Sequence, residues 1–158
     1  MIYVIDSEFI DTSLASELIS FGVVNEKMQT RYFEFDFDVK ALTPSLHENV
    51  VPHLSGKRTT FYDAAQDLIA FVEYPPDAEF WAYYGAYDWY WLCRLFGGMM
   101  SIPQGWPRGY NELGYYTQQV PNVAGPEHNA ENDAISTMEH FKTLRRKGIV
   151  HEGMHHRL

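Results

Sequence analysis

The stretch that decides the fold is Ile2-Tyr3-Val4-Ile5-Asp6-Ser7-Glu8, near the start of the chain. Its apolar run, rich in β-branched and aromatic residues, predicts a buried central strand. Because side chains alternate along a strand, Asp6 and Glu8 should point to one side and Ser7 to the other. Two carboxylates at the end of a buried strand repel each other and are poorly solvated. A bound cation is the usual compensation, and carboxylate oxygens are the ligands that Mg²⁺ prefers.

Three residues far away in the sequence extend this candidate site. Asp133 lies in the first turn of a predicted helix, and His128 lies just before that helix, where an imidazole can act as a base. Asp88, after Ala86-Tyr87, opens another predicted helix. Four carboxylates and one histidine form a set suited to metal-dependent phosphodiester hydrolysis.

Each of these residues also has a purely structural explanation when it is taken alone. Asp88 fits a helix N-cap, and Asp133 fits the positive end of a helix dipole. His128 fits a loop residue without a partner, and an Asp-x-Glu pair is common. If there were no functional site, every one of these structural explanations would have to be true at the same time. The functional interpretation is therefore favoured.

The same residues carry a family resemblance. The chain resembles the DEDD superfamily of 3′–5′ exonucleases (DnaQ-like, ribonuclease-H-like) in its DEDDh branch, where a histidine stands five positions before the last aspartate. Three blocks occur in the family's order: Asp6-Ser7-Glu8-Phe9, Gly85-Ala86-Tyr87-Asp88, and His128 to Asp133. Asp-x-Glu alone is a weak signal, whereas all the blocks in order are a strong one.

Within this superfamily, the chain is most similar to the small stand-alone exoribonucleases of the RNase AS type, which prefer adenylate-rich RNA. The resemblance spans most of residues 1–140. The matching strings are Ser7-Glu8-Phe9-Ile10, Glu17-Leu18-Ile19-Ser20-Phe21-Gly22-Val23-Val24, Trp81-Ala82-Tyr83-Tyr84-Gly85-Ala86-Tyr87-Asp88 and Leu92-Cys93-Arg94-Leu95-Phe96-Gly97.

The resemblance implies a fold and a mechanism. The fold is a ribonuclease-H-like α/β exonuclease fold, with a mixed central sheet flanked by helices. The cofactor is Mg²⁺, as two ions for which Mn²⁺ can substitute. Asp6 would bridge both ions, Glu8 and Asp133 would complete the nucleophile-side site, and Asp88 would hold the second ion. His128 would accept the proton of the attacking water, and a 5′-mononucleotide would leave.

The resemblance and the aromatic composition also suggest substrate contacts. Phe9 and Ile10 follow the acidic pair and would contact the terminal base and sugar, although Phe9 fits a core residue equally well. Tyr84, just before Gly85, is the best candidate for an exposed aromatic that faces the ligand, within a dense aromatic stretch of which most residues are expected to be core. The implied substrate is the 3′ end of single-stranded RNA. The alternatives are a 3′–5′ exodeoxyribonuclease of the proofreading type and a non-catalytic nucleic-acid-binding module.

Composition restricts the class of protein. The 158 residues fit one domain, expected over 1–148 with a loose tail at 149–158. No apolar run approaches the ~20 residues of a membrane span, and there is no signal peptide, so a cytoplasmic location is expected, with Cys93 as the single cysteine. A net charge of −9 argues against a protein that coats nucleic acid. A basic cluster late in the last predicted helix is interpreted as a solvated helix end; it comprises Lys142, Arg145, Arg146 and Lys147.

The pattern of the sequence predicts three successive strands in an antiparallel meander, followed by alternating helical and extended elements. The predicted strands are 1–9, 16–25, 30–38 and 79–84, and the predicted helices are 61–73, 87–96 and 130–147. Residues 44–59 are expected to be loop or short helix. The last helix should end at Gly148.

Segment 97–126 is rich in glycine and proline and is long for an irregular connection. A short helix is expected near 110–118. The segment also carries apolar residues, which are Met99, Met100, Ile102, Trp106 and Tyr110. We expect them to pack across the two-fold axis of a homodimer. The alternative is that the segment folds back over its own active site, with these residues as local core.

Overall fold

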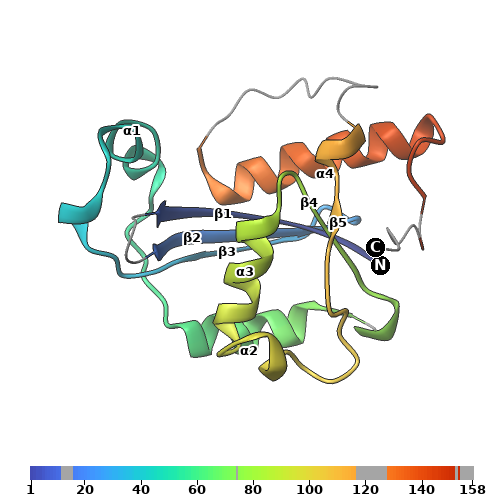
Figure 1. Cartoon of the computed structure of the whole chain (residues 1–158), viewed down its shortest axis with the longest axis horizontal. Coiled ribbons are helices and arrows are strands. Elements are labelled where there is room, and N and C mark those ends of the chain that lie inside the picture. The colour runs from blue at the N-terminus through green and yellow to red at the C-terminus, as the bar shows by residue number, and fades with distance from the viewer. Residues whose placement is uncertain (12–15, 74, 117–127, 152, 154–158) are drawn as a thin grey trace.

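The structure is a computed structural model that describes residues 1–11, 16–73, 75–116, 128–151 and 153. Its centre is a five-stranded mixed sheet in the order β3-β2-β1-β4-β5 (Figure 1). The strands are β1 (Ile2–Asp11), β2 (Ser16–Asn25), β3 (Thr30–Glu34), β4 (Glu79–Ala82) and β5 (Asn111–Glu112). β1, β2 and β3 form the predicted antiparallel meander, whereas β4 runs parallel to β1 and β5 runs parallel to β4.

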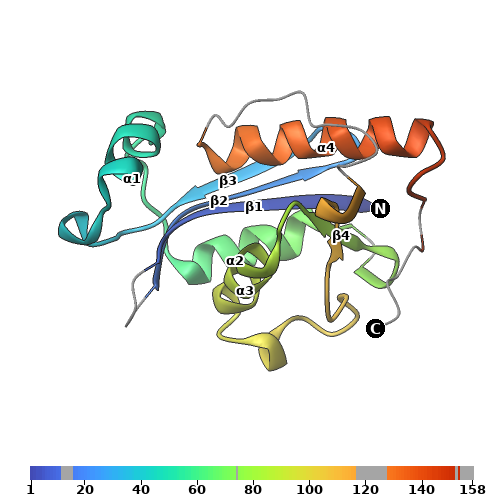
Figure 2. The ribbon, with the colours of Figure 1, turned by 45° about the horizontal axis from the view of Figure 1, so that its top comes forward.

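Helices cover both faces of this sheet. Figures 1 and 2 show α4 on one face and α2 with α3 on the other, while α1 lies beyond one end of the sheet. The helices are α1 (Pro44–Asn49), α2 (Phe61–Phe71), α3 (Ala86–Leu95) and α4 (Ala130–Arg146). The described residues also form short 3₁₀ turns, which are η1 (Val39–Ala41), η2 (Val51–His53), η3 (Pro75–Asp77), η4 (Met99–Ser101) and η5 (Gly114–Tyr116). This arrangement confirms the predicted fold class.

Alternation along β1 divides the core into two layers. Ile2 and Val4 pack with residues of α4, whereas Tyr3 and Ile5 pack with residues of α2 and α3. All four side chains are at most 1% exposed. The same alternation places the carboxylates that follow Ile5 on the α4 face of the strand.

α4 lies directly against the sheet at Gly22 of β2. A Cβ at that position would lie 2.2 Å from the carbonyl oxygen of Ala130, far inside van der Waals contact. Glycine therefore allows the first turn of α4 to approach β2 and β1, which positions the start of this helix over the place where Gly22 pairs with Asp6.

Most element boundaries agree with the predictions within a few residues, and Gly148 follows the end of α4 with φ 70°. Two predictions were wrong. The third strand ends at Glu34, four residues early. Residues 111–112 form β5, and within the described residues 110–116 only Gly114–Tyr116 is helical, where a helix over 110–118 was expected. The loose tail at 149–158 stays a prediction: Val150 is 1% exposed and packs in the core cluster that includes residues of α4, and residues 154–158 lie outside the described residues.

The segment after α3 buries two of its apolar residues in the core. Ile102 and Trp106 are 3% and 4% exposed. The ring of Trp106 lies 5.5 Å from that of Phe80. Burial within the chain explains these residues, so the prediction that Trp106 lies in a dimer interface was wrong. Residues 117–126 lie outside the described part of the chain.

Within the described residues, no helix has both the length and the apolar composition needed to cross a membrane.

Candidate active site

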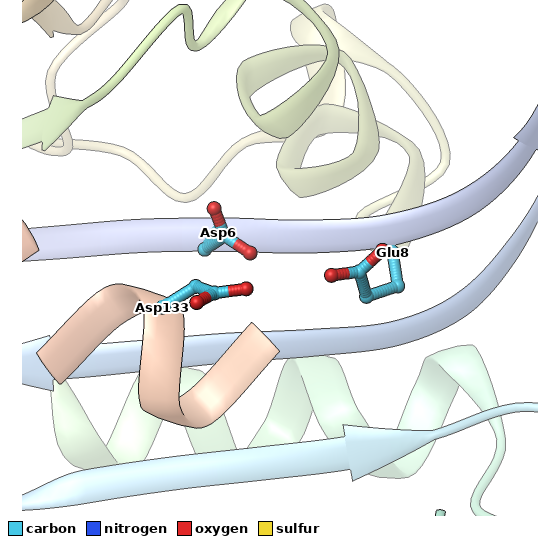
Figure 3. Close-up of side chains that lie close together, drawn as sticks. All are labelled: Asp6, Glu8 and Asp133. Carbon is cyan, nitrogen blue, oxygen red and sulfur yellow. The ribbon is translucent and has the colours of Figure 1, made fainter. Parts of the chain in front are cut away.

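Three carboxylates converge between β1 and the first turn of α4. Asp6 and Glu8 extend from the same side of β1, and Asp133 extends from α4 toward them (Figure 3). One oxygen from each residue lies within 4.8 Å of the others. An all-oxygen set of this size suits a hard divalent cation, so the cluster could hold a metal ion.

The N-terminus of α4 is fixed by a strong cap. The side chain of Asn129 accepts hydrogen bonds from the backbone N–H groups of Glu131 and Asn132, both at 3.1 Å. Its amide also donates to the hydroxyl of Tyr32 in β3, at 3.4 Å. These contacts, together with the close approach at Gly22, hold Asp133 over β1.

His128 immediately precedes this cap and is partly buried. Its φ of 48° is in the left-handed region, which is uncommon for a residue with a side chain. Backbone conformations of this kind occur often at functional sites. The predicted base therefore lies at the same helix start that carries Asp133.

Asp88 lies beside the cluster of three and is held from β1. It is the third residue of α3, whose N-cap is Gly85, so the alternative that Asp88 caps this helix is wrong. Its carboxylate accepts a hydrogen bond of 2.5 Å from the hydroxyl of Ser7. Ser7 points away from Asp6 and Glu8, as the alternation predicts, and its contact joins the start of α3 to β1.

The four carboxylates share a strongly unfavourable electrostatic environment. Burial, and then the charges of Asp88, Glu8 and Asp133, raise the pKa of Asp6 well above its usual value. Burial, and then the charges of Asp133 and Asp88, raise the pKa of Glu8 to about 7. A nearby cation favours the charged forms and would reverse these shifts.

The pKa of Asp88 is raised as well, but by a different combination of causes. Burial raises its pKa and the hydrogen bonds from Ser7 lower it, while the charge of Glu112 raises it further, to about 7 overall. Only 6% of Asp88 is exposed. A buried carboxyl with such a pKa in a site of this kind is a candidate functional group.

The three residues predicted to contact substrate have different environments. Tyr84 is 70% exposed, as expected for a ligand-facing residue. Phe9 is half-buried, and its ring stacks on Tyr87 at 4.5 Å. Ile10 differs from the prediction, because it is 1% exposed and packs with Ile19 in a small core cluster.

Sequence reasoning missed two residues next to the site. Tyr87, one of an aromatic stretch of which most residues were expected to be core, is 42% exposed over Phe9, and its hydroxyl donates to Asp11 at 3.0 Å. Glu112 on β5 accepts hydrogen bonds from the backbone of the turn that leads to Asp88, including that of Gly85 at 2.9 Å. A two-residue strand has no periodicity, so no signal in the sequence identified Glu112.

Curated relatives match nearly the whole chain. A 3′–5′ exoribonuclease of Mycobacterium tuberculosis strain CDC 1551 is 30% identical over 156 residues, which cover 91% of this chain and 93% of the relative. A 3′–5′ exoribonuclease of strain H37Rv matches with the same values.

The chain belongs to this family of 3′–5′ exoribonucleases.

Solved structures extend the relationship at the level of fold. This exoribonuclease family member matches a chain in the structure of the yeast NOT1 MIF4G domain co-crystallized with CAF1, with a TM-score of 0.61 over 94% of this chain and 80% of that chain. It matches the RNase domain of the yeast Pop2 protein with a TM-score of 0.57, over 87% and 73%. It also matches cell-death related nuclease 4, with 0.55 over 93% and 64%.

These structures are each 14% identical to the chain, so they support the ribonuclease-H-like exonuclease fold alone. No family model matches the sequence. The curated relatives and the fold together confirm the exonuclease resemblance that the acidic blocks indicated.

Proposed function

We propose that this protein is a divalent-metal-dependent 3′–5′ exoribonuclease that releases 5′-mononucleotides from single-stranded 3′ ends. The observation that carries the proposal is the convergence of Asp6, Glu8 and Asp133 within 4.8 Å. It occurs in a chain that is related over 91% of its length to 3′–5′ exoribonucleases. A free buried cysteine, Cys93, is compatible with the proposed cytoplasmic location.

The donor set fits Mg²⁺, and it fits Mn²⁺ as a substitute, because every ligand is a carboxylate oxygen. In the proposed arrangement Asp6, Glu8 and Asp133 would hold one ion, and Asp88 together with Asp6 would hold a second. The crowding that raises the pKa of Asp6 supports a role in cation binding. When bound, the ions supply an activated water and stabilise the leaving oxygen.

His128 is the proposed general base. An imidazole that is neutral near pH 7 can accept the proton of the attacking water. His128 lies one residue before the N-cap of α4, so the base and Asp133 belong to the same helix start. The leaving group is the 3′ oxygen of the penultimate nucleotide.

Aromatic residues beside the acidic cluster are the proposed contacts for terminal bases. Tyr87 stacks on Phe9 and keeps 42% of its surface exposed. Tyr84, 70% exposed, is the other candidate. Stacking of one base on such a ring stabilises binding by ~1–3 kcal/mol. We therefore propose Tyr87, instead of the buried Ile10, as a residue that contacts the terminal nucleotide.

RNA is the proposed substrate because both relatives are named exoribonucleases. A proofreading-type exodeoxyribonuclease remains the second candidate, since the same acidic site serves either backbone. The 2′-hydroxyl distinguishes the two substrates. A non-catalytic binding module would be expected to lack a carboxylate or the histidine, and all five residues are present in this sequence.

The test uses 5′-labelled RNA and DNA of one sequence, each with a free or a phosphorylated 3′ end, and a circular RNA. We expect Mg²⁺-dependent shortening of the RNA from its free 3′ end, slower digestion of DNA, and protection by the 3′ phosphate. Faster digestion of DNA favours the proofreading candidate. Internal cleavage of the circular RNA contradicts an exonuclease.

We also propose that the protein is a homodimer. With Trp106 in the core, Met99 and Met100 are apolar residues that the segment after α3 leaves exposed, at 51% and 93%. Light scattering at micromolar concentration measures the assembly directly. A mass near 18.4 kDa contradicts the dimer, and a Met100→Asp variant that halves a doubled mass supports an interface at η4.

A further inference from the structure

We propose that Glu112 is the positioning residue for Asp88: its carboxylate fixes the turn between β4 and α3, so that Asp88 stays aligned with Asp6 in the metal site. This inference rests on the proposed function, because it treats Asp88 as part of a cation site. Glu112 itself neither binds metal nor contacts substrate in this account.

The carboxylate of Glu112 is occupied by backbone donors. Oε1 accepts from the N–H of Tyr84 at 2.7 Å and from that of Gly114 at 2.6 Å, and Oε2 accepts from the N–H of Gly85 at 2.9 Å. Two oxygens that accept three hydrogen bonds have little capacity left for another partner. Glu112 therefore acts on the site through the backbone that it holds, in addition to the charge by which it raises the pKa of Asp88.

The turn that Glu112 holds has an unusual conformation. Tyr84 has φ 56°, in the left-handed region that residues with side chains rarely adopt. Such a conformation persists when its surroundings determine it strongly. The N–H groups of Tyr84 and Gly85, on either side of the Tyr84 carbonyl, both point at one carboxylate, which fixes this part of the turn.

Close packing around the turn leaves no space for a side chain at positions 85 and 114, which are both glycine. A Cβ on Gly114 would lie 2.8 Å from Oε1 of Glu112 and 2.9 Å from the ring of Tyr84. A Cβ on Gly85 would lie 2.2 Å from the Cβ of Ala82. The carboxylate thus fits into a tightly packed turn, and movement of that turn requires loss of these contacts.

The turn determines where Asp88 lies. Gly85 is the N-cap of α3, and its carbonyl accepts the N–H of Trp89, which encloses Asp88 in the first turn of the helix. Asp88 then meets the hydroxyl of Ser7 on β1. Asp88 is therefore fixed from two sides, directly by Ser7 and through the backbone by Glu112.

The test compares wild type with Glu112→Gln and Glu112→Ala. Glutamine keeps the shape but replaces one acceptor by an N–H₂ group that faces backbone donors. Glu79→Gln is the matched control, because Glu79 lies at the opposite end of β4 and also accepts N–H groups, from Trp81 and Gly153. The readouts are Mn²⁺ affinity by electron paramagnetic resonance, amide exchange in residues 83–88, and RNA hydrolysis.

Outer partners that orient metal ligands typically contribute ~10–100-fold in metal affinity or activity. We expect both Glu112 variants to weaken Mn²⁺ binding by about that factor and to exchange faster at Tyr84 and Gly85, while Glu79→Gln matches wild type. Wild-type Mn²⁺ affinity in folded Glu112→Gln overturns the inference, as does an equal loss in Glu79→Gln. If the Glu112 variants lose Mn²⁺ affinity but wild type hydrolyses no RNA, the inference holds and the proposed function fails.

Discussion

Glu8 shows how the site couples metal binding to stability at the scale of one residue. Its pKa is raised from 4.5 to about 7 in the folded chain, first by burial and then by Asp133 and Asp88. The folded state therefore binds more protons than the unfolded state between these two values. Without metal, the free energy of unfolding should fall as the pH rises through this window.

Glu8→Gln removes this charge and should stabilise the metal-free protein. In EDTA we expect a gain on the order of 1–3 kcal/mol at pH 8, which disappears toward pH 4 where both states of wild type are protonated. Thermal unfolding of both proteins at each pH measures it, with exposed Glu48→Gln as the control. A Glu8→Gln variant that is less stable than wild type at pH 8 in EDTA contradicts the electrostatic description.

His128→Ala separates the role of the base from that of the metal ligands. We expect turnover to fall by ~10²–10⁴-fold, while RNA affinity in the presence of a divalent cation stays the same. Single-turnover kinetics and RNA binding measure the two effects, and His47→Ala in α1 is the control. Equal losses of binding and of rate would argue that His128 binds substrate or metal instead.

At the residue scale, the sequence was informative where local geometry determines position. Alternation predicted that Asp6 and Glu8 share a side, and the helix start predicted the place of Asp133. The contacts of Ser7 and Glu112 could not be predicted, because both partners are set by tertiary packing. For the same reason, composition could not show that Ile10 is buried and Tyr87 exposed.

At the scale of elements, the site depends on how closely α4 approaches the sheet. Gly22→Ala places a methyl group 2.2 Å from the carbonyl oxygen of Ala130, so the start of α4 must move away. We expect a loss of ~1–3 kcal/mol in stability from overpacking, together with a larger loss of turnover, because Asp133 moves with the helix.

Gly109→Ala is the matched control for this variant, since a Cβ there meets nothing within 4 Å. Chemical denaturation and RNA hydrolysis measure the two effects. Full activity in a folded Gly22→Ala protein would show that the placement of α4 tolerates this shift.

Elements with a strong periodic pattern were predicted well, and short ones were not. β1, β2 and α4 have long apolar runs or amphipathic patterns that fix their type. β5 has two residues, so its pairing with β4 follows from the tertiary fold alone. Trp106 illustrates the same limit, because an irregular segment does not reveal whether its apolar residues face inward.

At the scale of the whole molecule, the site forms where three elements meet at β1. β1 brings Asp6 and Glu8, α3 brings Asp88, and α4 brings Asp133, with His128 two residues before the start of that helix. The chain carries a net charge of −9, and part of that charge is concentrated here. An anionic phosphodiester can approach such a site only when cations neutralise it.

The most direct test of this account is the release of mononucleotides from 3′-labelled RNA by wild type and by Asp6→Asn, each in Mg²⁺ and in EDTA. Asp6 contributes one of the three carboxylates of the cluster, and asparagine keeps its size while removing its charge. We predict release of labelled 5′-mononucleotide only by wild type in Mg²⁺, with Asp6→Asn folded but inactive. Wild-type activity that persists in EDTA, or full activity of Asp6→Asn in Mg²⁺, would contradict the account.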